Sequence, residues 1–371
     1  MSANEMLGEA KSEYTEMQDR PDRLRAVPWG AVILYVVIAM GLAWVVALPI
    51  WLTGGADSPQ LAILVPVLGA VMMLTPTIAA LCAMFITKTP RRERARFLGL
   101  WPLRPAKRVV WFMVGALFAP ILLVVLVTLI AAALGLVHLD LVHFSGFQAM
   151  IDGQLAALGP EQAATVKAAM PPIGALVALQ LLTIPIGAVI NTVFALGEEL
   201  GWRGWLTPAL RPLGVWPAIL ITGVVWGLWH SPLILIGYNF GYTDWRGVAL
   251  MVGGCVAWGA LLAWARLRSA SVWPAAIGHG ALNASAGLVV LFAAAGSAPD
   301  MGVVGPLGML AWAVIAVIVV VLVLTGQFGH EPQLAPRRMR AQAMPQLPPS
   351  QMSGGGSVPA SSGDPIRDPA A

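Results

Sequence analysis

Eight long stretches without a charged residue constrain the fold of this 371-residue chain more than any other feature. A helix needs about 20 mostly apolar residues to cross a bilayer, and each stretch is long enough to hold them. Open strands leave backbone groups without partners in lipid, so helices are the predicted structure. The stretches are 26–56, 58–87, 109–139, 168–197, 212–243, 247–265, 269–299 and 301–329.

Composition supports an all-α, polytopic membrane protein of about eight transmembrane helices. The chain is 58% hydrophobic and 11% charged, whereas a soluble domain carries about 25% charged residues. We predict a cytoplasmic N-terminal arm over 1–27, a membrane domain over 28–328, and a disordered cytoplasmic tail rich in Pro, Gln, Gly and Ser over 329–371. Two cysteines, both in apolar stretches, build no disulfide framework. The one sizeable external loop is 138–171, where "AALGPEQAATVKAAM" predicts a short surface helix.

The placement of Lys and Arg predicts the orientation. With the N-terminus inside, all of the 22 basic residues except Lys167 and Arg246 fall on the inner side. Because positive charge marks cytoplasmic loops, both termini are predicted to be cytoplasmic. The richness in Ala, Gly and Arg favours a bacterial plasma membrane. Since the basic residues follow the inner membrane face, the lipid bilayer is the predicted partner and no nucleic acid is expected.

Few ionisable residues lie within or against the predicted spans, and such residues are costly in lipid and typically functional. Three are in "GEELGWRGW", directly after a long apolar run. If the helix continues, Glu199 and Arg203 are four residues apart in the orientation that favours an ion pair. Glu198 is rotated by about 100° from Glu199, which leaves it free to face elsewhere. The alternative is that all three charges form an ordinary helix end at the membrane interface.

The later stretches add two histidines and an asparagine. His230, in "VVWGLWHSPL", is predicted to lie deeper in the membrane than the other candidates, and alone it could be an interhelical hydrogen-bonding residue. His279 and Asn283, in "IGHGALNASAG", are four residues apart and share a helix face. Small neighbours make close helix packing the alternative reading of that pair. Together, carboxylates, imidazoles and an amide on three helices favour convergence on a site that binds a divalent metal or activates water for amide hydrolysis.

Three ordered motifs resemble those of the CPBP family of intramembrane proteases, which includes the CAAX prenyl endopeptidases. "EELGWRG" matches Glu-Glu-x-x-x-Arg, "WGLWH" resembles Phe-x-x-x-His with Trp226 in place of the phenylalanine, and "HGALN" matches His-x-x-x-Asn. The resemblance covers about 184–288. It implies an intramembrane endopeptidase whose partner is a protein or peptide substrate. In this enzyme Glu198 and His230 would activate a water molecule, while Glu199 and Arg203 support the site. It also implies a catalytic cavity open to the cytoplasm.

The same resemblance implies that His279 and Asn283 stabilise the oxyanion. For the cofactor it leaves two versions open: a zinc ion held by Glu198, His230 and His279, or a metal-free glutamate mechanism. Two other functions remain as alternatives. One is a non-catalytic membrane scaffold or bacteriocin-immunity protein with the same fold; the other is a transporter in which the same Glu and His residues relay protons.

Overall fold

The computed structural model describes residues 26–156 and 158–329. The predicted tail from 330 onward and nearly all of the predicted N-terminal arm lie outside these residues. The α-helices are α2 (Trp29–Leu52), α3 (Leu61–Met72), α4 (Thr75–Ile86), α5 (Arg91–Phe97), α6 (Ala106–Ala133), α7 (Ser145–Ala156), α8 (Pro160–Ala169), α9 (Ile173–Glu199), α10 (Thr207–Leu210), α11 (Val215–Trp229), α12 (Ser231–Ile234), α13 (Trp245–Ser269), α14 (Trp273–Ser285), α15 (Leu288–Phe292), α16 (Met301–Val304) and α17 (Met309–Leu324). Among the described residues the only β-type pairing is an isolated bridge between Leu139 and Ala293, so the all-α class is confirmed.

Among the described residues, seven helical segments are long and apolar enough to cross a membrane, and each overlaps a predicted stretch. Several are composite: α3 and α4 form one segment, α14 and α15 another, and α9 continues to Leu213. The remaining stretch, 212–243, differs, because it contains α11 of 15 residues and then the short α12. At 1.5 Å per residue, α11 is only about 22 Å long and ends inside the thickness of a bilayer.

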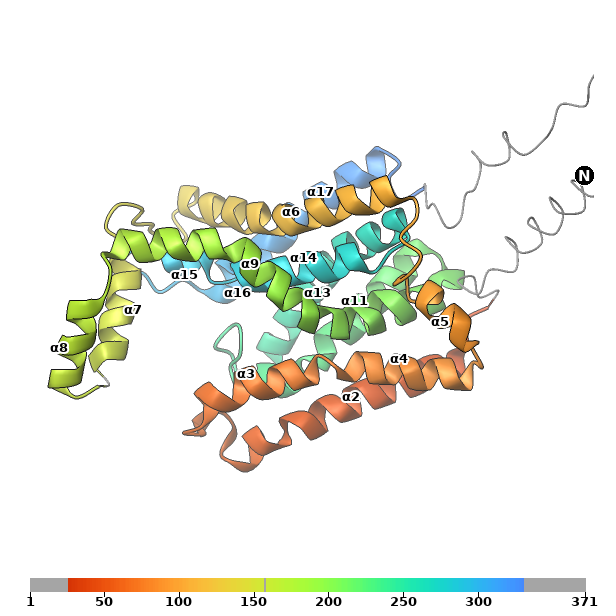
Figure 1. Cartoon of the computed structure of the whole chain (residues 1–371), viewed down its shortest axis with the longest axis horizontal. Helices are drawn as coiled ribbons and strands as arrows, with labels where there is room; N and C mark the ends of the chain where they lie inside the picture. The colour runs from red at the N-terminus through yellow and green to blue at the C-terminus, as the bar shows by residue number, and fades with distance from the viewer. Residues whose placement is uncertain (1–25, 157, 330–371) are drawn as a thin grey trace, which may run out of the picture.

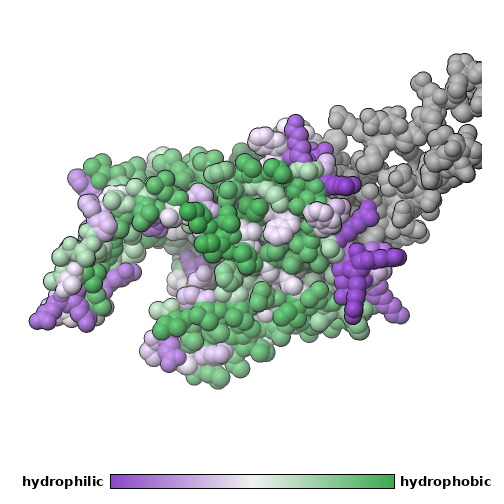
Figure 2. Space-filling view, viewed as in Figure 1, coloured by the Kyte–Doolittle hydropathy of each residue, from purple (hydrophilic) through white to green (hydrophobic). Residues whose placement is uncertain are grey.

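The helices pack in layers. α2, α3 and α4 lie together along one edge of the molecule, α6 and α17 lie along the opposite edge, and α9, α13 and α14 run between them (Figure 1). Apolar side chains cover the lateral surface, and hydrophilic ones gather at the end that carries α5 (Figure 2). The surface is also hollowed between the α7–α9 region and α3, away from that basic end (Figure 2). The predicted cavity on the cytoplasmic side stays a prediction.

The loop 138–171 contains two helices. The predicted surface helix is present as α8, and α7 precedes it. Lys167 of α8 forms an ion pair with Asp152 of α7 at 2.8 Å, and both side chains are largely exposed. The two helices α7 and α8 project from the end of the bundle opposite α5 (Figure 1).

A helical hairpin places the glutamates well inside the protein. After Glu199 the chain continues through a π-helix, Leu200–Leu206, then α10 and a 3₁₀ turn, Arg211–Leu213. It reverses at Gly214, whose φ of 105° is in the region that favours glycine, and α11 runs back. Gly214 lies 16 residues after Glu198 and 16 residues before His230. Glu198 and His230 therefore lie at the same depth along the hairpin. This accounts for the deep position predicted for His230.

The crossing of α11 and α13 depends on small residues. A Cβ atom on Gly223 of α11 would lie 2.8 Å from the Cα atom of Val256 on α13, closer than van der Waals contact allows. Gly223→Ala is therefore expected to force the helices apart and to destabilise the protein by about 1–3 kcal/mol, the usual cost of overpacking. Thermal unfolding in detergent measures the effect. Gly41→Ala in α2 is the matched control, because nothing lies within 4 Å of that Cβ position; equal midpoints for both variants would contradict the prediction.

Candidate active site

The two adjacent glutamates lie where α9 changes into the π-helix. Such irregular turns are frequent at functional sites. Glu198 is 2% exposed and Glu199 is 0% exposed. Their sequence position does not mark a helix end at the membrane interface, because the helical segment runs on to Leu213. Two carboxylates inside an apolar bundle need polar partners, and the structure provides a different set for each.

Glu199 joins an arginine to a histidine from another helix. Its Oε1 atom accepts a hydrogen bond from Arg203 Nη1 at 2.7 Å, so the predicted ion pair is present. The same oxygen lies 3.0 Å from His279 Nδ1. Because the carboxylate accepts a hydrogen bond from Nδ1, the Nε2 atom of His279 is left to interact with another group. Glu199 thus fixes the orientation of the His279 ring.

Glu198 accepts hydrogen bonds from two indole groups. Trp226 Nε1 donates to Glu198 Oε2 at 2.7 Å, and Trp202 Nε1 donates to the same oxygen at 3.2 Å. Both tryptophans are buried. Sequence reasoning singled out Trp226 only as an aromatic residue of a motif and did not consider Trp202. The signal available was the exchange of a phenylalanine for a tryptophan, which adds a hydrogen-bond donor.

His230 lies at the end of α11 beside this network. Its Nδ1 atom is 2.8 Å from the carbonyl oxygen of Trp226, an arrangement in which Nδ1 donates and Nε2 is available as an acceptor. The ring is 4.7 Å from that of Trp229 and nearly perpendicular to it. The free thiol of Cys255, on α13, lies 3.9 Å from Nδ1. The structure therefore brings His230 into the same buried region as Glu198.

Asn283 has a different environment from the other candidates. It lies one turn after His279 on α14, and it is exposed whereas His279 is 4% exposed. Among the described contacts, none joins the Asn283 side chain to a glutamate or histidine of the network. An exposed amide one turn from a buried histidine can face water or a ligand that reaches His279.

Two threonines at the start of α4 form hydrogen bonds with α9 and α11, the helices that carry Glu198 and lead to His230. Thr75 Oγ1 accepts a hydrogen bond from Trp229 Nε1 at 3.0 Å, and Thr77 Oγ1 donates to the carbonyl oxygen of Gly197 at 2.5 Å. These contacts attach the end of α11 and the turn that precedes Glu198 to the second span. Neither threonine was predicted from the sequence, since a hydroxyl in an apolar helix usually bonds to its own backbone.

The described residues do not assemble a ready metal site. Among them, no group of three or more His, Cys, Asp and Glu side chains has an arrangement that could hold a metal ion. The two imidazoles alone are suitable, because each has its Nδ1 atom engaged and its Nε2 atom available, as in many metal-binding histidines. Glu198 Oε2, however, already accepts two indole N–H groups. Of the predicted set of Glu198, His230 and His279, the glutamate thus has only Oε1 without a described hydrogen bond, and the zinc site stays a prediction.

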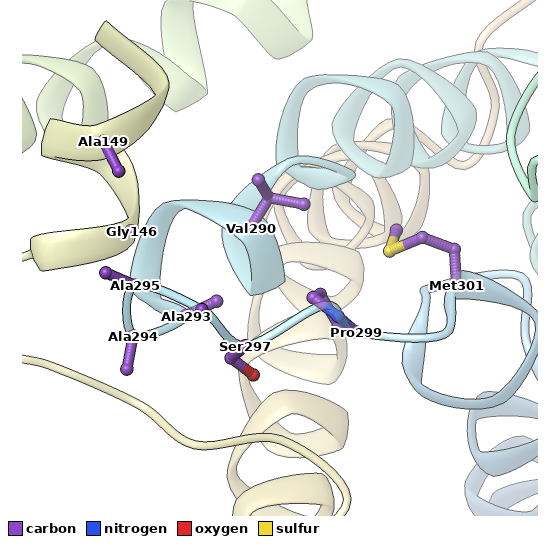
Figure 3. A pocket seen from close by; sticks show the side chains of 10 residues that line it. Gly146, Ala149, Val290, Ala293, Ala294, Ala295, Ser297, Pro299 and Met301 are labelled. Carbon is purple, nitrogen blue, oxygen red and sulfur yellow. The ribbon is translucent and has the colours of Figure 1, made fainter. Parts of the chain in front are cut away.

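A pocket of about 280 Å³ lies elsewhere, between α7 and the segment that follows α15 (Figure 3). Small and apolar side chains line it, including Ala149, Val290 and Met301. None of the candidate site residues borders it.

Comparison with known proteins finds matches to the part of the chain that contains the candidate site. Residues 178–285 match the family described as type II CAAX prenyl endopeptidase Rce1-like. Over 101 residues the chain is 29% identical to CAAX prenyl protease 2 of Methanococcus maripaludis, a match that covers 25% of this chain and 37% of that relative. The matched region 178–285 contains all the residues that the sequence singled out for the site.

The apolar helical segments of the described residues define an integral membrane protein. Residues 178–285 are similar to this family of CAAX prenyl endopeptidases, which lies within the CPBP family that the three motifs resemble. The resemblance predicted over 184–288 is therefore confirmed.

Proposed function

We propose that the protein is an intramembrane endopeptidase that hydrolyses a peptide bond of a membrane-associated protein or peptide. The observation that carries the proposal is the convergence of Glu198, Glu199, His230 and His279, from three helical segments, around Trp226. Ionisable groups are costly to bury in a membrane protein, and those that are buried typically serve a function. The relative named CAAX prenyl protease 2 makes peptides with a C-terminal CAAX sequence the first substrates to test.

In the proposed reaction Glu198 is the general base. It takes a proton from a water molecule whose oxygen attacks the carbonyl carbon of the scissile bond. His230, through Nε2, orients that water. The proton is then delivered to the amide nitrogen, the C–N bond breaks, and a carboxylate and an amine are released.

His279 and Asn283 are proposed to stabilise the oxyanion. When the His279 ring carries both protons, Nδ1 donates to Glu199 and Nε2 donates to the oxyanion. The exposed amide of Asn283 supplies a second donor one turn away. Arg203, which pairs with Glu199 at 2.7 Å, holds that carboxylate in place.

The test is cleavage of membrane-anchored peptides by the full chain in liposomes. The panel contains peptides that end in a CAAX sequence, with and without a prenyl group on its cysteine, and peptides without that sequence. We expect cleavage by the wild type and a loss of about 100-fold or more in His279→Ala, the usual effect of removing an oxyanion donor. Mass spectrometry of the products measures it. Identical products and rates from wild type and His279→Ala would refute the protease and leave a scaffold or transporter function.

We propose the metal-free version of the mechanism, because Glu198 Oε2 already accepts hydrogen bonds from two indole N–H groups. Treatment with a chelator that removes zinc is therefore expected to leave the cleavage rate within about twofold of the untreated rate, since general-base catalysis alone supplies a large acceleration. A zinc-dependent protease of known activity, reconstituted in the same liposomes, serves as the control for chelation. Loss of cleavage that zinc restores would establish the metal version.

A further inference from the structure

Trp226 makes contact with every ionisable member of the site except Glu199. Its indole N–H donates to Glu198, and its backbone carbonyl oxygen lies 2.8 Å from His230 Nδ1. The guanidinium carbon of Arg203 is 4.2 Å from the centre of its ring. The ring of His279 meets it edge-on, with the centres 5.2 Å apart. No other described aromatic side chain has contacts of this kind with all four residues.

The contact with Glu198 is the one that bears on chemistry. At 2.7 Å it is short for an N–H···O hydrogen bond, and both residues are 2% exposed. A hydrogen bond to a charged group contributes more than one between neutral groups, and it is not weakened by competing water at a buried site. The bond engages Oε2, so it fixes the plane of the carboxylate and the direction of Oε1. Trp202 donates to the same oxygen at 3.2 Å and supports that orientation.

The ring of Trp226 also limits where the other groups can move. Arg203 lies over one region of the ring and His279 packs edge-on against it, so a smaller side chain would loosen both. A cation near an aromatic ring is attracted more strongly when water is excluded. The tryptophan therefore restrains Arg203 and His279 while it holds the carboxylate.

We propose that Trp226 is a positioning residue for hydrolysis, and that its indole N–H holds the Glu198 carboxylate in the orientation in which it acts as general base. This inference rests on the proposed function. It assigns a specific task to the position at which the "WGLWH" segment departs from the phenylalanine of the motif it resembles. Since phenylalanine has no donor, a substitution that matches the motif more closely should be harmful in this chain.

Kinetics of Trp226→Phe in liposomes give the first test. We expect kcat to fall about 10- to 100-fold, the effect of losing one hydrogen bond to a charged group, with KM within about twofold of the wild type. A tryptophan analogue in which sulfur replaces the ring N–H, inserted at position 226, keeps the ring and is expected to lower kcat to the same extent. Unchanged kcat with the analogue would overturn the proposal.

Trp258→Phe is the matched control. Trp258 is also buried, and its Nε1 donates to the carbonyl oxygen of Pro306 at 2.8 Å, which is not a residue of the site. The Trp258→Phe variant loses a buried hydrogen bond of similar length to the one lost in Trp226→Phe, so any general effect on folding should be similar. We expect its kcat to stay within about twofold of the wild type. A fall equal to that of Trp226→Phe would show that the effect is structural, and the proposal would fail.

An NMR measurement on the full chain separates this inference from the proposed function. Indole N–H signals are recorded with ¹⁵N-labelled tryptophan, and Trp226 and Trp202 are assigned by their Phe variants. In Glu198→Gln, these two signals are expected to move further than all other tryptophan signals. A stationary Trp226 signal would refute the contact whatever the activity. If the Trp226 signal moves but the wild type cleaves no peptide, the proposed protease function is refuted while the contact between Trp226 and Glu198 is supported.

Discussion

Glu198→Gln is expected to abolish cleavage while the protein stays folded. An amide has nearly the same size as a carboxylate, and its carbonyl oxygen still accepts a hydrogen bond from Trp226. It cannot take a proton from water, so the general-base contribution of about 100- to 10,000-fold is lost. Single-turnover cleavage in liposomes measures the rate, and thermal unfolding in detergent checks the fold.

Glu161→Gln is the control for that variant. Glu161 is an exposed residue in the first turn of α8, far along the chain from the site, and its substitution should leave the rate unchanged. A Glu198→Gln protein that cleaves at a rate within about twofold of the Glu161→Gln protein would show that Glu198 is not the base.

The sequence predicted which segments form the helices of the bundle better than it predicted where those helices begin and end. Each observed span overlaps a charge-free stretch because lipid imposes one simple requirement on every helix that crosses it. The stretch 212–243 contains a shorter helix because α11 and α12 pack against other helices, and a helix buried in protein need not match the bilayer. The run of helix beyond Glu199 could not be decided from composition, since Arg203 and Arg211 are equally compatible with an interface and with a buried network.

The structure brings Glu198, Glu199, Arg203, His230 and His279 together, but the sequence indicated only part of the contacts among them. The spacing of Glu199 and Arg203 was enough to predict their ion pair, because a contact between residues four apart depends only on local geometry. The contact between Glu199 and His279 joins α9 to α14, and no spacing within one segment encodes it. The two indole donors to Glu198 were missed because a tryptophan in an apolar run reads as packing until the structure shows where its N–H points.

Arg203→Met is expected to be the most destabilising single change at the site. Arg203 is 1% exposed and Glu199 is 0% exposed, so removing the arginine leaves a buried carboxylate without its cation. The expected loss is about 3–5 kcal/mol of unfolding free energy, the usual cost of breaking a buried ion pair from one side. Unfolding in detergent, followed by circular dichroism, measures it. Arg246→Met is the control, since its ion pair with Asp244 is largely exposed and surface pairs contribute about 0–1 kcal/mol.

The double variant Glu199→Gln with Arg203→Met separates the stability of the ion pair from its function. Removing both charges is often neutral or even stabilising in a protein interior, so we expect the double variant to regain most of the stability that Arg203→Met loses. Cleavage should not return with it, because a neutral amide at position 199 no longer stabilises a doubly protonated His279 ring and the Nε2 donor is lost. A double variant that is stable and fully active would show that Glu199 and Arg203 serve the fold alone.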